Sequence, residues 1–315
     1  MSFKNRQMRL FWQRMVLALV GTLVATMGRD VAAAENEPPP GLTYADVSYA
    51  PHVSCTLDFC QAPGDGPRPL LVYIHGGGWT GGDKRADAGD VRPFLEKGIS
   101  YAAINYRLTS EALLPAPVHD AARAIQFLRT KAKEWNIDAT RIALTGGSAG
   151  ACTSMWILFH DDLADPQSPD PVLRESTRVV AAAVHGGQTS IDPKVIEPWL
   201  GPNVLQHRMI HLSVGESSLQ QALDNYDKHR PLYEEFSPYN HLDAQDPPLL
   251  MTYRMKLTLP SEDKSHGIHH PVYGLKLKEK SDALGHECHL VITASSTADP
   301  YHSAREFLME KLTKQ

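Results

Sequence analysis

The chain has 315 residues, a formal net charge of −5 and 42% hydrophobic residues. Its length fits one sizeable α/β domain. The acidic balance argues against nucleic acid or an anionic lipid surface as a partner. The spacing of its four cysteines specifies no disulfide.

The N-terminal segment has the composition of a secretory signal. Four basic residues within the first 14 positions precede an apolar run over residues 15–27, and Val31-Ala32-Ala33-Ala34 follows. This order predicts a signal peptide over residues 1–34 with cleavage after Ala34. The apolar run would span only about 20 Å as a helix, short of the roughly 30 Å hydrocarbon core, so a retained membrane anchor is the weaker alternative. Residues 35–315 are therefore expected to form one exported domain, periplasmic or extracellular, without a stable membrane span.

From residue 46 onward, short apolar runs alternate with helical patterns. Strands are expected at 46–50 and 54–61 as a pair, and then at 70–74, 101–106, 141–145, 179–184, 249–253 and 289–293. Helices are expected at 90–97, 118–135, 149–160, 271–284 and 303–314. The alternation predicts an α/β fold with a doubly wound, mainly parallel sheet and helices on both faces.

Two segments interrupt this alternation. Residues 161–176 are acidic and proline-rich, which is typical of a surface excursion. Residues 188–246 separate two strands by more than one crossover helix needs, and they contain five aromatic residues. We expect this insertion to form a lid or pocket wall over the carboxyl edge of the sheet, where ligands bind in open α/β folds. A packed helical insertion without substrate contact is the alternative.

Glycine-rich turns follow two of the expected strands. The strand at 70–74 leads into His75-Gly76-Gly77-Gly78-Trp79, and the strand at 141–145 leads into Gly146-Gly147-Ser148-Ala149-Gly150. The first turn can offer backbone N–H groups to a developing oxyanion. The second is a Gly-x-Ser-x-Gly sequence between a strand and a helix, which is typical of a nucleophile elbow. An ordinary strand–helix turn is the alternative, but the two motifs together predict a serine hydrolase with Ser148 as nucleophile.

The chain resembles the α/β-hydrolase-fold esterases and lipases related to hormone-sensitive lipase and to the feruloyl/acetyl-xylan esterase-like (BD-FAE-like) group. Besides the two turns, the resemblance is carried by Gly81-Gly82-Asp83-Lys84, Asn105-Tyr106-Arg107-Leu108, the segment 115–120 and the segment 237–242. It implies an oxyanion hole formed by the N–H groups of Gly77, Gly78 and Ala149. It also implies ester hydrolysis through an acyl-enzyme. The short stretch before the sheet fits the esterase-like branch better than the lipase branch.

The base and the acid of a catalytic triad are harder to place. The chain order in this fold is serine, acid, histidine. His302 follows the last expected strand and precedes a helix-capping pattern, so it is the predicted general base. The aspartate that the resemblance implies shortly after the strand at 249–253 is absent. Asp263 is the preferred acid, and Asp192 and Glu262 remain alternatives.

Histidines are frequent near the C-terminus, at positions 266, 269, 270, 286 and 302. They lack the tight ligand spacing of metal motifs, so no metal or cofactor is predicted. The predicted function is an exported serine carboxylic ester hydrolase acting on short-chain or carbohydrate-linked esters. The alternative is a catalytically degraded α/β-hydrolase scaffold that binds a carbohydrate or a protein, because the expected aspartate and the usual histidine-glycine pair are missing.

Overall fold

The computed structural model describes residues 41–85, 88–293, 299–301 and 303–314. The predicted signal peptide lies outside the described residues. The strands are β1 (Leu42–Ser48), β2 (Thr56–Cys60), β3 (Arg68–Ile74), β4 (Ser100–Ile104), β5 (Ile137–Gly147), β6 (Ala181–His185), β7 (Leu249–Tyr253) and β8 (Cys288–Ile292). The helices are α2 (Ala88–Leu95), α3 (Ala116–Thr130), α4 (Ala149–Phe159), α5 (Pro193–Leu200), the 3₁₀ helix η1 (Pro202–Gln206), α6 (Met209–Leu212), α7 (Leu219–Asp224), α8 (Tyr226–Glu235), α9 (Pro238–His241), α10 (Lys264–Ile268), α11 (Val272–Leu284) and α12 (Ala304–Thr313).

The strands form one sheet in the order β1-β2-β4-β3-β5-β6-β7-β8. The two pairings that involve β2 are antiparallel, and the strands from β4 to β8 pair in parallel. The predicted doubly wound, mainly parallel sheet is therefore confirmed. Parallel strands align their carboxyl ends at one edge, which brings the turns after β3, β5, β6 and β7 together there.

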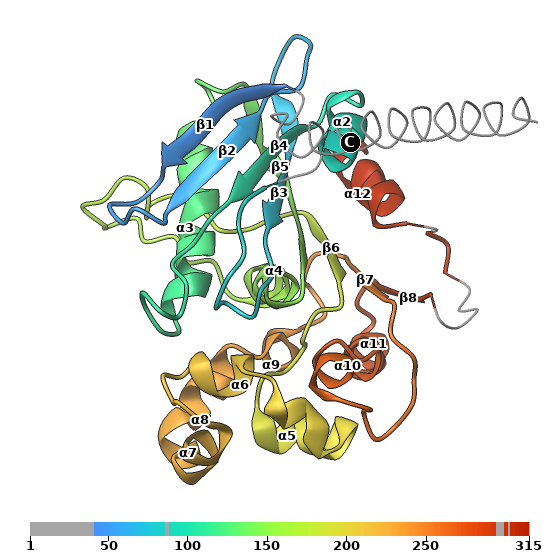
Figure 1. Ribbon diagram of the computed structural model, residues 1–315. Helices are drawn as coiled ribbons and strands as arrows, with labels where there is room; N and C mark the ends of the chain where they lie inside the picture. Colours follow the sequence, from blue (N-terminus) through green and yellow to red (C-terminus); the bar gives the residue numbers. More distant parts are fainter. Residues whose placement is uncertain (1–40, 86–87, 294–298, 302, 315) are drawn as a thin grey trace, which may run out of the picture. The chain divides into compact units, whose positions relative to one another are not determined.

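Successive side chains of a strand point to opposite faces of the sheet, and here the side chains on both faces are apolar. Helices therefore cover both faces. On one face, strand residues such as Leu70 and Leu144 join a large core with α3, α4 and α11. On the other face, residues such as Leu71 and Ala143 pack under α2 and α12. Figure 1 shows α2 and α12 together on one side of the strands.

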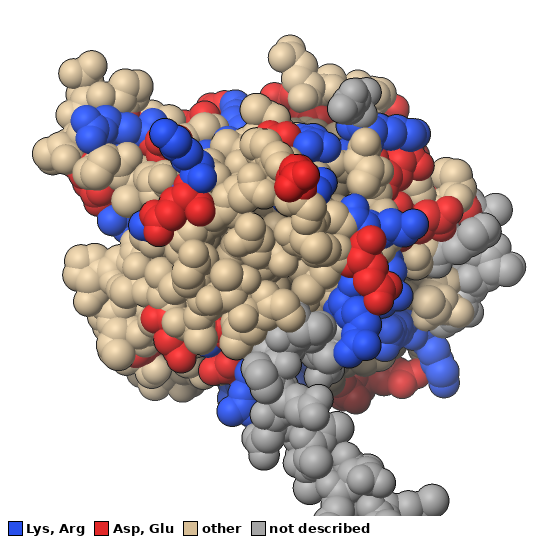
Figure 2. All heavy atoms as spheres, turned by 90° about the horizontal axis from the view of Figure 1, so that it is seen from above, with Lys and Arg blue, Asp and Glu red and all other residues tan. Residues whose placement is uncertain are grey.

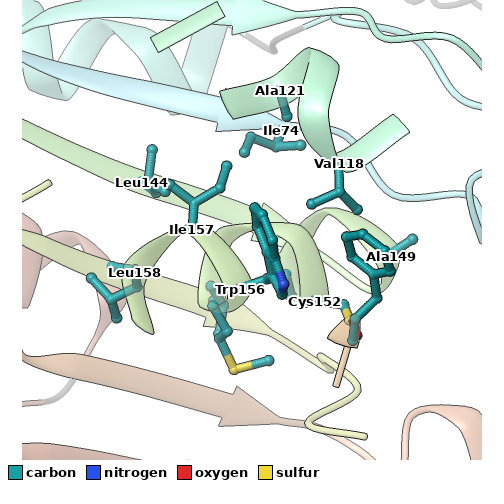
Figure 3. Packing of buried hydrophobic residues seen from close by; sticks show 14 of the residues in the cluster. Ile74, Val118, Ala121, Leu144, Ala149, Cys152, Trp156, Ile157 and Leu158 are labelled. Atoms are coloured by element: carbon teal, nitrogen blue, oxygen red, sulfur yellow. The ribbon is translucent and has the colours of Figure 1, made fainter. Parts of the chain in front are cut away.

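Helix α4 is buried along its whole length. It begins directly after the Gly-x-Ser turn and is apolar on every side, as expected of a helix enclosed by other elements. Figure 3 shows Trp156 and Ile157 of this helix among Ile74 and Leu144 of the central strands and Val118 of α3. The start of α4 therefore has little freedom to shift relative to the sheet.

The insertion at 188–246 forms the short helices α5 to α9 and η1, drawn in yellow and light orange in Figure 1. Its contacts reach both α4 and the loop after β4. The Trp156 indole donates to the Glu235 carbonyl at 2.9 Å, and the Leu114 N–H donates to the Ser213 carbonyl at 3.1 Å. The insertion thus packs beside the carboxyl edge of the sheet, where a pocket wall was expected.

A partly buried ion pair joins the segment after β4 to α3. The Arg107 guanidinium donates to both oxygens of Asp120, each at 2.7 Å, and the Arg107 N–H adds a third bond at 3.1 Å. The neighbouring Tyr106 hydroxyl donates to the carbonyl of His75 at 2.8 Å. The ion pair therefore fixes Arg107, and the adjacent Tyr106 is bonded to the start of the first glycine-rich turn.

The four cysteines are free and buried, in agreement with the absence of a sequence-specified disulfide. On the face drawn in Figure 2, acidic and basic side chains are interspersed, and the larger group of basic residues has acidic ones beside it. Within the described residues, no helix is long and apolar enough to cross a bilayer.

Replacing Asp120 by alanine should destabilise the fold. The change leaves a partly buried guanidinium and a backbone N–H without their acceptor, and breaking such a pair costs about 3 kcal/mol, the low end of the usual range, because Arg107 is partly exposed. Urea denaturation of the variant and the wild type measures the difference. Glu134→Ala, which removes the exposed partner of Lys131, is the matched control and should leave the midpoint unchanged.

Candidate active site

Ser148 occupies a strained turn between β5 and α4. Its φ of 53° and ψ of −122° lie outside the regions that serine normally adopts. The turn is held by the Ser148 N–H, which donates to the carbonyl of His185 at 2.9 Å. A side chain at Gly150 would overlap the carbonyl oxygen of Ile74, so only glycine allows α4 to start this close to β3. These are the features expected of a nucleophile elbow.

The turn after β3 has a backbone that requires glycine. Gly77 and Gly78 have φ values of 101° and 65°, in the region that side chains rarely adopt. The next residue, Trp79, is fully buried, and its indole donates to the Thr153 hydroxyl on α4 at 3.0 Å. The turn is therefore fixed to the same helix that positions Ser148.

The two turns lie against each other. A Cβ built on Gly76 would lie 3.3 Å from the Ser148 Cβ and 2.6 Å from the Gly147 carbonyl oxygen. Within the described part of the chain, the N–H groups of Gly77 and Gly78 donate to no acceptor. The N–H of Ala149 belongs to the first turn of α4, where helices leave N–H groups unpaired. The turn that contains Gly77 and Gly78 therefore lies next to the elbow that contains Ser148 and Ala149.

The Ser148 hydroxyl is paired with His269. The distance between the Ser148 Oγ and the His269 Nε2 is 3.0 Å. The other ring nitrogen, Nδ1, lies 3.0 Å from the backbone carbonyl oxygen of Ser265. Because a carbonyl can only accept, Nδ1 carries the proton and Nε2 is the nitrogen free to take the serine proton. The ring also lies against Gly186, directly after β6.

Burial lowers the pKa of His269 below its usual value of 6.5, and the hydrogen bond to the Ser265 carbonyl opposes this shift only in part. The imidazole is therefore neutral at neutral pH, which is the state that a general base requires. Among the described side chains, no carboxylate is bonded to this ring.

Helix α10 determines where His269 stands. Asp263 caps its N-terminus by accepting N–H bonds from Ser265 at 2.7 Å and His266 at 2.8 Å. His269 follows the last residue of this helix. His266 and His270 face away from Ser148, and their Nε2 atoms donate to backbone carbonyls of the loop after β7, at 2.9 and 3.1 Å. His266 and His270 thus hold the loop after β7, whereas His269 is bonded to Ser148.

The three predicted acids bond elsewhere in the structure or are exposed. Asp263 serves as the cap of α10 instead of orienting a histidine ring among the described residues. Asp192 caps α5 and accepts the Tyr226 hydroxyl at 2.9 Å, and Glu262 is exposed. His302, the predicted base, lies outside the described residues. The helix after β7 thus brings a histidine to Ser148, where the resemblance implied a carboxylate.

One sequence pattern points to His269, although the usual order of the triad residues along the chain does not. The residue follows β7, whose carboxyl end lies at the same edge as the elbow, and it comes directly after a short helix with an aspartate at its N-cap. Chain order favours His302 instead, because that residue follows the last strand. In the part of the chain that the structure describes, no group of three or more His, Cys, Asp or Glu side chains is placed to hold a metal ion.

A model of the BD-FAE family matches residues 57–266, two thirds of the chain. The chain belongs to the BD-FAE family. The matched region includes both glycine-rich turns and ends within α10, so the family region contains Ser148 but stops short of His269.

Curated relatives of this BD-FAE protein are named as ester hydrolases. The probable carboxylic ester hydrolase LipM of Mycobacterium tuberculosis is 28% identical over 229 residues, which cover 70% of this chain and 50% of LipM. The esterase LipQ of the same organism is 27% identical over 238 residues, covering 70% of this chain and 51% of LipQ. The chain therefore spans about half the length of these relatives.

Solved structures share the fold. A truncated carbohydrate esterase from gut microbiota superposes with a TM-score of 0.68 at 21% identity, covering 88% of this chain and 100% of that one. Esterase Est2 of the planctomycete Thermogutta terrifontis superposes with a TM-score of 0.56 at 21% identity, covering 88% and 94%. The α/β-hydrolase type of the sheet is thereby shown.

Ser148→Ala should abolish covalent labelling by a fluorophosphonate probe, because the probe reacts only with an activated serine. The measurement is the intensity of the labelled band with equal amounts of folded protein. Ser110→Ala, which changes an exposed serine, is the control and should be labelled like the wild type. Equal labelling of the Ser148 variant would rule out this serine as the nucleophile.

His269→Gln should lower ester hydrolysis by about 10²-fold or more, since loss of the base costs about 10⁶ in a complete triad, and the acid that no described residue supplies already accounts for about 10⁴ of this. The parallel variant His302→Gln should keep turnover within a few-fold of the wild type. Both are measured with p-nitrophenyl acetate. A large loss in His302→Gln with little change in His269→Gln would reverse the assignment.

Proposed function

We propose that this protein is a serine carboxylic ester hydrolase that works through an acyl-enzyme. The observation that carries the proposal is the 3.0 Å contact between the Ser148 Oγ and the His269 Nε2, at an elbow that faces the 76–78 turn. A serine with a neutral imidazole on one side and unpaired backbone N–H groups on the other has the parts that acyl transfer needs. The names of the curated relatives support ester bonds as the target.

In the proposed reaction, the Ser148 Oγ attacks the ester carbonyl carbon while its proton passes to the His269 Nε2. The carbonyl π electrons move to the oxygen, where the N–H groups of Gly77, Gly78 and Ala149 receive the negative charge. The tetrahedral intermediate collapses, the alcohol leaves with the proton from His269, and the acyl group stays on Ser148. Water then repeats the sequence and releases the acid.

His269 is oriented by a main-chain carbonyl in this mechanism. The Ser265 carbonyl holds the Nδ1 proton and so selects the tautomer that can accept at Nε2. A neutral dipole stabilises the imidazolium of the transition state less than a carboxylate would. In a known triad protease, loss of the acid alone costs about 10⁴ in turnover, whereas an oxyanion hole and substrate binding retain about 10³–10⁴ over water. We therefore expect a slow hydrolase that favours activated, short-chain esters.

Carbohydrate-linked esters outside the cytoplasm are the proposed natural substrates. The basic and apolar leader supports export, and a similar fold occurs in a carbohydrate esterase and in an acetyl ester-xyloside bifunctional hydrolase. The polar groups of the site, namely Ser148, the neutral His269 ring and the unpaired backbone N–H groups, carry no charge. This fits the removal of acetyl or similar small, uncharged acyl groups from sugars. The insertion at 188–246 is the proposed wall for the alcohol side of the ester.

A degraded scaffold that binds a carbohydrate or a protein is the second candidate. It is favoured by one observation, namely that no carboxylate among the described residues contacts His269. The fluorophosphonate experiment separates the two proposals, because a scaffold without an activated serine would remain unlabelled while still folded.

Alanine substitution at Asp192, Glu262 and Asp263 should not produce the loss of about 10⁴ that a triad acid produces. Asp263→Ala should have an indirect effect, since it removes the cap of the helix that carries His269, and Asp263→Asn should restore activity because asparagine is also a good N-cap. Turnover of p-nitrophenyl acetate is measured for each folded variant. A loss of orders of magnitude in Asp263→Asn would identify Asp263 as a true acid.

The acid limb of the pH–rate profile should have its midpoint below pH 6.5. Burial lowers the pKa of His269, so the ring stays neutral, and able to accept a proton, to a lower pH than an ordinary histidine. Activity is thus retained from neutral pH down through pH 6.5 and is lost as the pH falls through the lowered pKa. The measurement is kcat/KM of p-nitrophenyl acetate between pH 4.5 and 8. A midpoint above 6.5 would indicate a carboxylate beside the base.

A further inference from the structure

A second histidine, His207, lies beside residues 76–78, which are called the oxyanion turn below. His207 directly follows η1 in the insertion, and its ring is partly exposed. A Cβ built on Gly78 would lie 3.5 Å from the His207 Cε1. The centroids of the His207 and His269 rings are 6.4 Å apart, with the rings at 71° to each other. His207 therefore borders both the oxyanion donors and the base.

The position of His207 is fixed by packing around η1. Val204 is fully buried and contacts Gly267 of α10, where a Cβ would lie only 2.8 Å from the Val204 Cα. The Asn203 side chain donates to the carbonyl of Ser261 at 2.8 Å. The helix η1, which precedes His207, thus packs against α10, which precedes His269. This packing fixes the placement of the two rings relative to each other.

The hydrogen bonds of His207 select one tautomer. Its Nδ1 accepts the N–H of Met209 at 3.3 Å, so a neutral ring must carry its proton on Nε2. Among the described residues, none pairs with that Nε2. Burial lowers the pKa of His207 to about 4, and His269, Arg208, Lys264 and His211 add to the shift. His207 is therefore a neutral donor, with its N–H available at the site.

We propose that His207 is a further catalytic residue, whose Nε2–H donates a hydrogen bond to the oxyanion formed on the substrate carbonyl. Cε1 is bonded to both ring nitrogens and faces the side of Gly78 where a Cβ would stand. Because Nδ1 already accepts the Met209 N–H, Nε2 is the ring nitrogen available on this side. The inference rests on the proposed ester hydrolysis and assigns the insertion a chemical part in it. A neutral donor suits this role because it stabilises the negative charge without transferring its proton to it.

The bonds and protons of the attack on the ester carbonyl balance as follows. The bond between the Ser148 Oγ and the carbonyl carbon forms, the serine proton moves to the His269 Nε2, and the π pair of the carbonyl becomes the charge on the oxygen. The Nε2–H bond of His207 stays intact throughout. When the intermediate collapses, the pair returns to the carbonyl and the hydrogen bond weakens, so the contribution of His207 is greatest in the transition state.

The test compares His207→Phe, His207→Gln and the control His211→Phe, which makes the same change on the same insertion. His207→Phe keeps a ring of similar shape but removes the donor, and kcat for p-nitrophenyl acetate should fall by about 10²–10³-fold with KM nearly unchanged. His207→Gln places an amide N–H near the Nε2 position and should recover most of the rate. His211→Phe should match the wild type.

A trifluoromethyl ketone, which forms a tetrahedral adduct with an active-site serine, provides the second measurement. Its inhibition constant should rise in His207→Phe by the same factor by which kcat falls, because the adduct carries the oxyanion. Thermal unfolding of each variant checks that the fold is retained.

Three results would overturn this inference alone, and a fourth would overturn it together with the proposed function. A rise in KM with unchanged kcat would show that His207 binds only the ground state. Equal losses in His207→Phe and His207→Gln together with a lowered Tm would show a structural role. Wild-type kinetics in His207→Phe would show no role, while fluorophosphonate labelling and hydrolysis by the wild type would leave the proposed esterase function standing. If the wild type neither hydrolyses the ester nor is labelled, both proposals fail together.

Discussion

The close contact between two glycine-rich turns is the constraint on which the rest of this structure depends. The turn after β3 and the elbow after β5 approach until backbone meets backbone, which requires the absence of side chains at Gly76 and Gly150. This approach holds Ser148 in a strained conformation that costs on the order of 1–3 kcal/mol. The cost is offset by the burial of α4 between the sheet and α3, which prevents the elbow from relaxing.

Among the described residues, the histidine beside Ser148 is held by a backbone carbonyl at the end of α10 rather than by a carboxylate. Asp263 starts a helix of five residues, and His269 follows its last residue with Nδ1 bonded to the helix carbonyl of Ser265. Asp263, the predicted triad acid, thus acts on His269 only indirectly, by capping the helix that precedes it. The orientation of the ring is retained, but no described residue places a negative charge in a hydrogen bond with it to stabilise its protonated form.

The insertion at 188–246 contributes chemistry as well as cover. Its short helices bury aromatic side chains against α4, and they bring one polar ring, His207, to the oxyanion turn. A site assembled from the sheet edge alone would have its donors only in the backbone. Attachment of η1 to α10 links the placement of His207 to that of His269, so changes in either segment should affect both rings.

The strand at 249–253 illustrates what the amino-acid sequence determined. Its bounds, the sheet class, the two turns and Ser148 all follow from local properties, because apolar runs, helical spacing and glycine requirements are encoded by residues close together in the chain. The partner of Ser148 was decided only by the tertiary structure. His269 is 121 positions from the serine, and the chain order of the fold favoured His302 over it. Which imidazole reaches the hydroxyl depends on how α10 packs beside the elbow, and that packing is set by long-range contacts that no local pattern records.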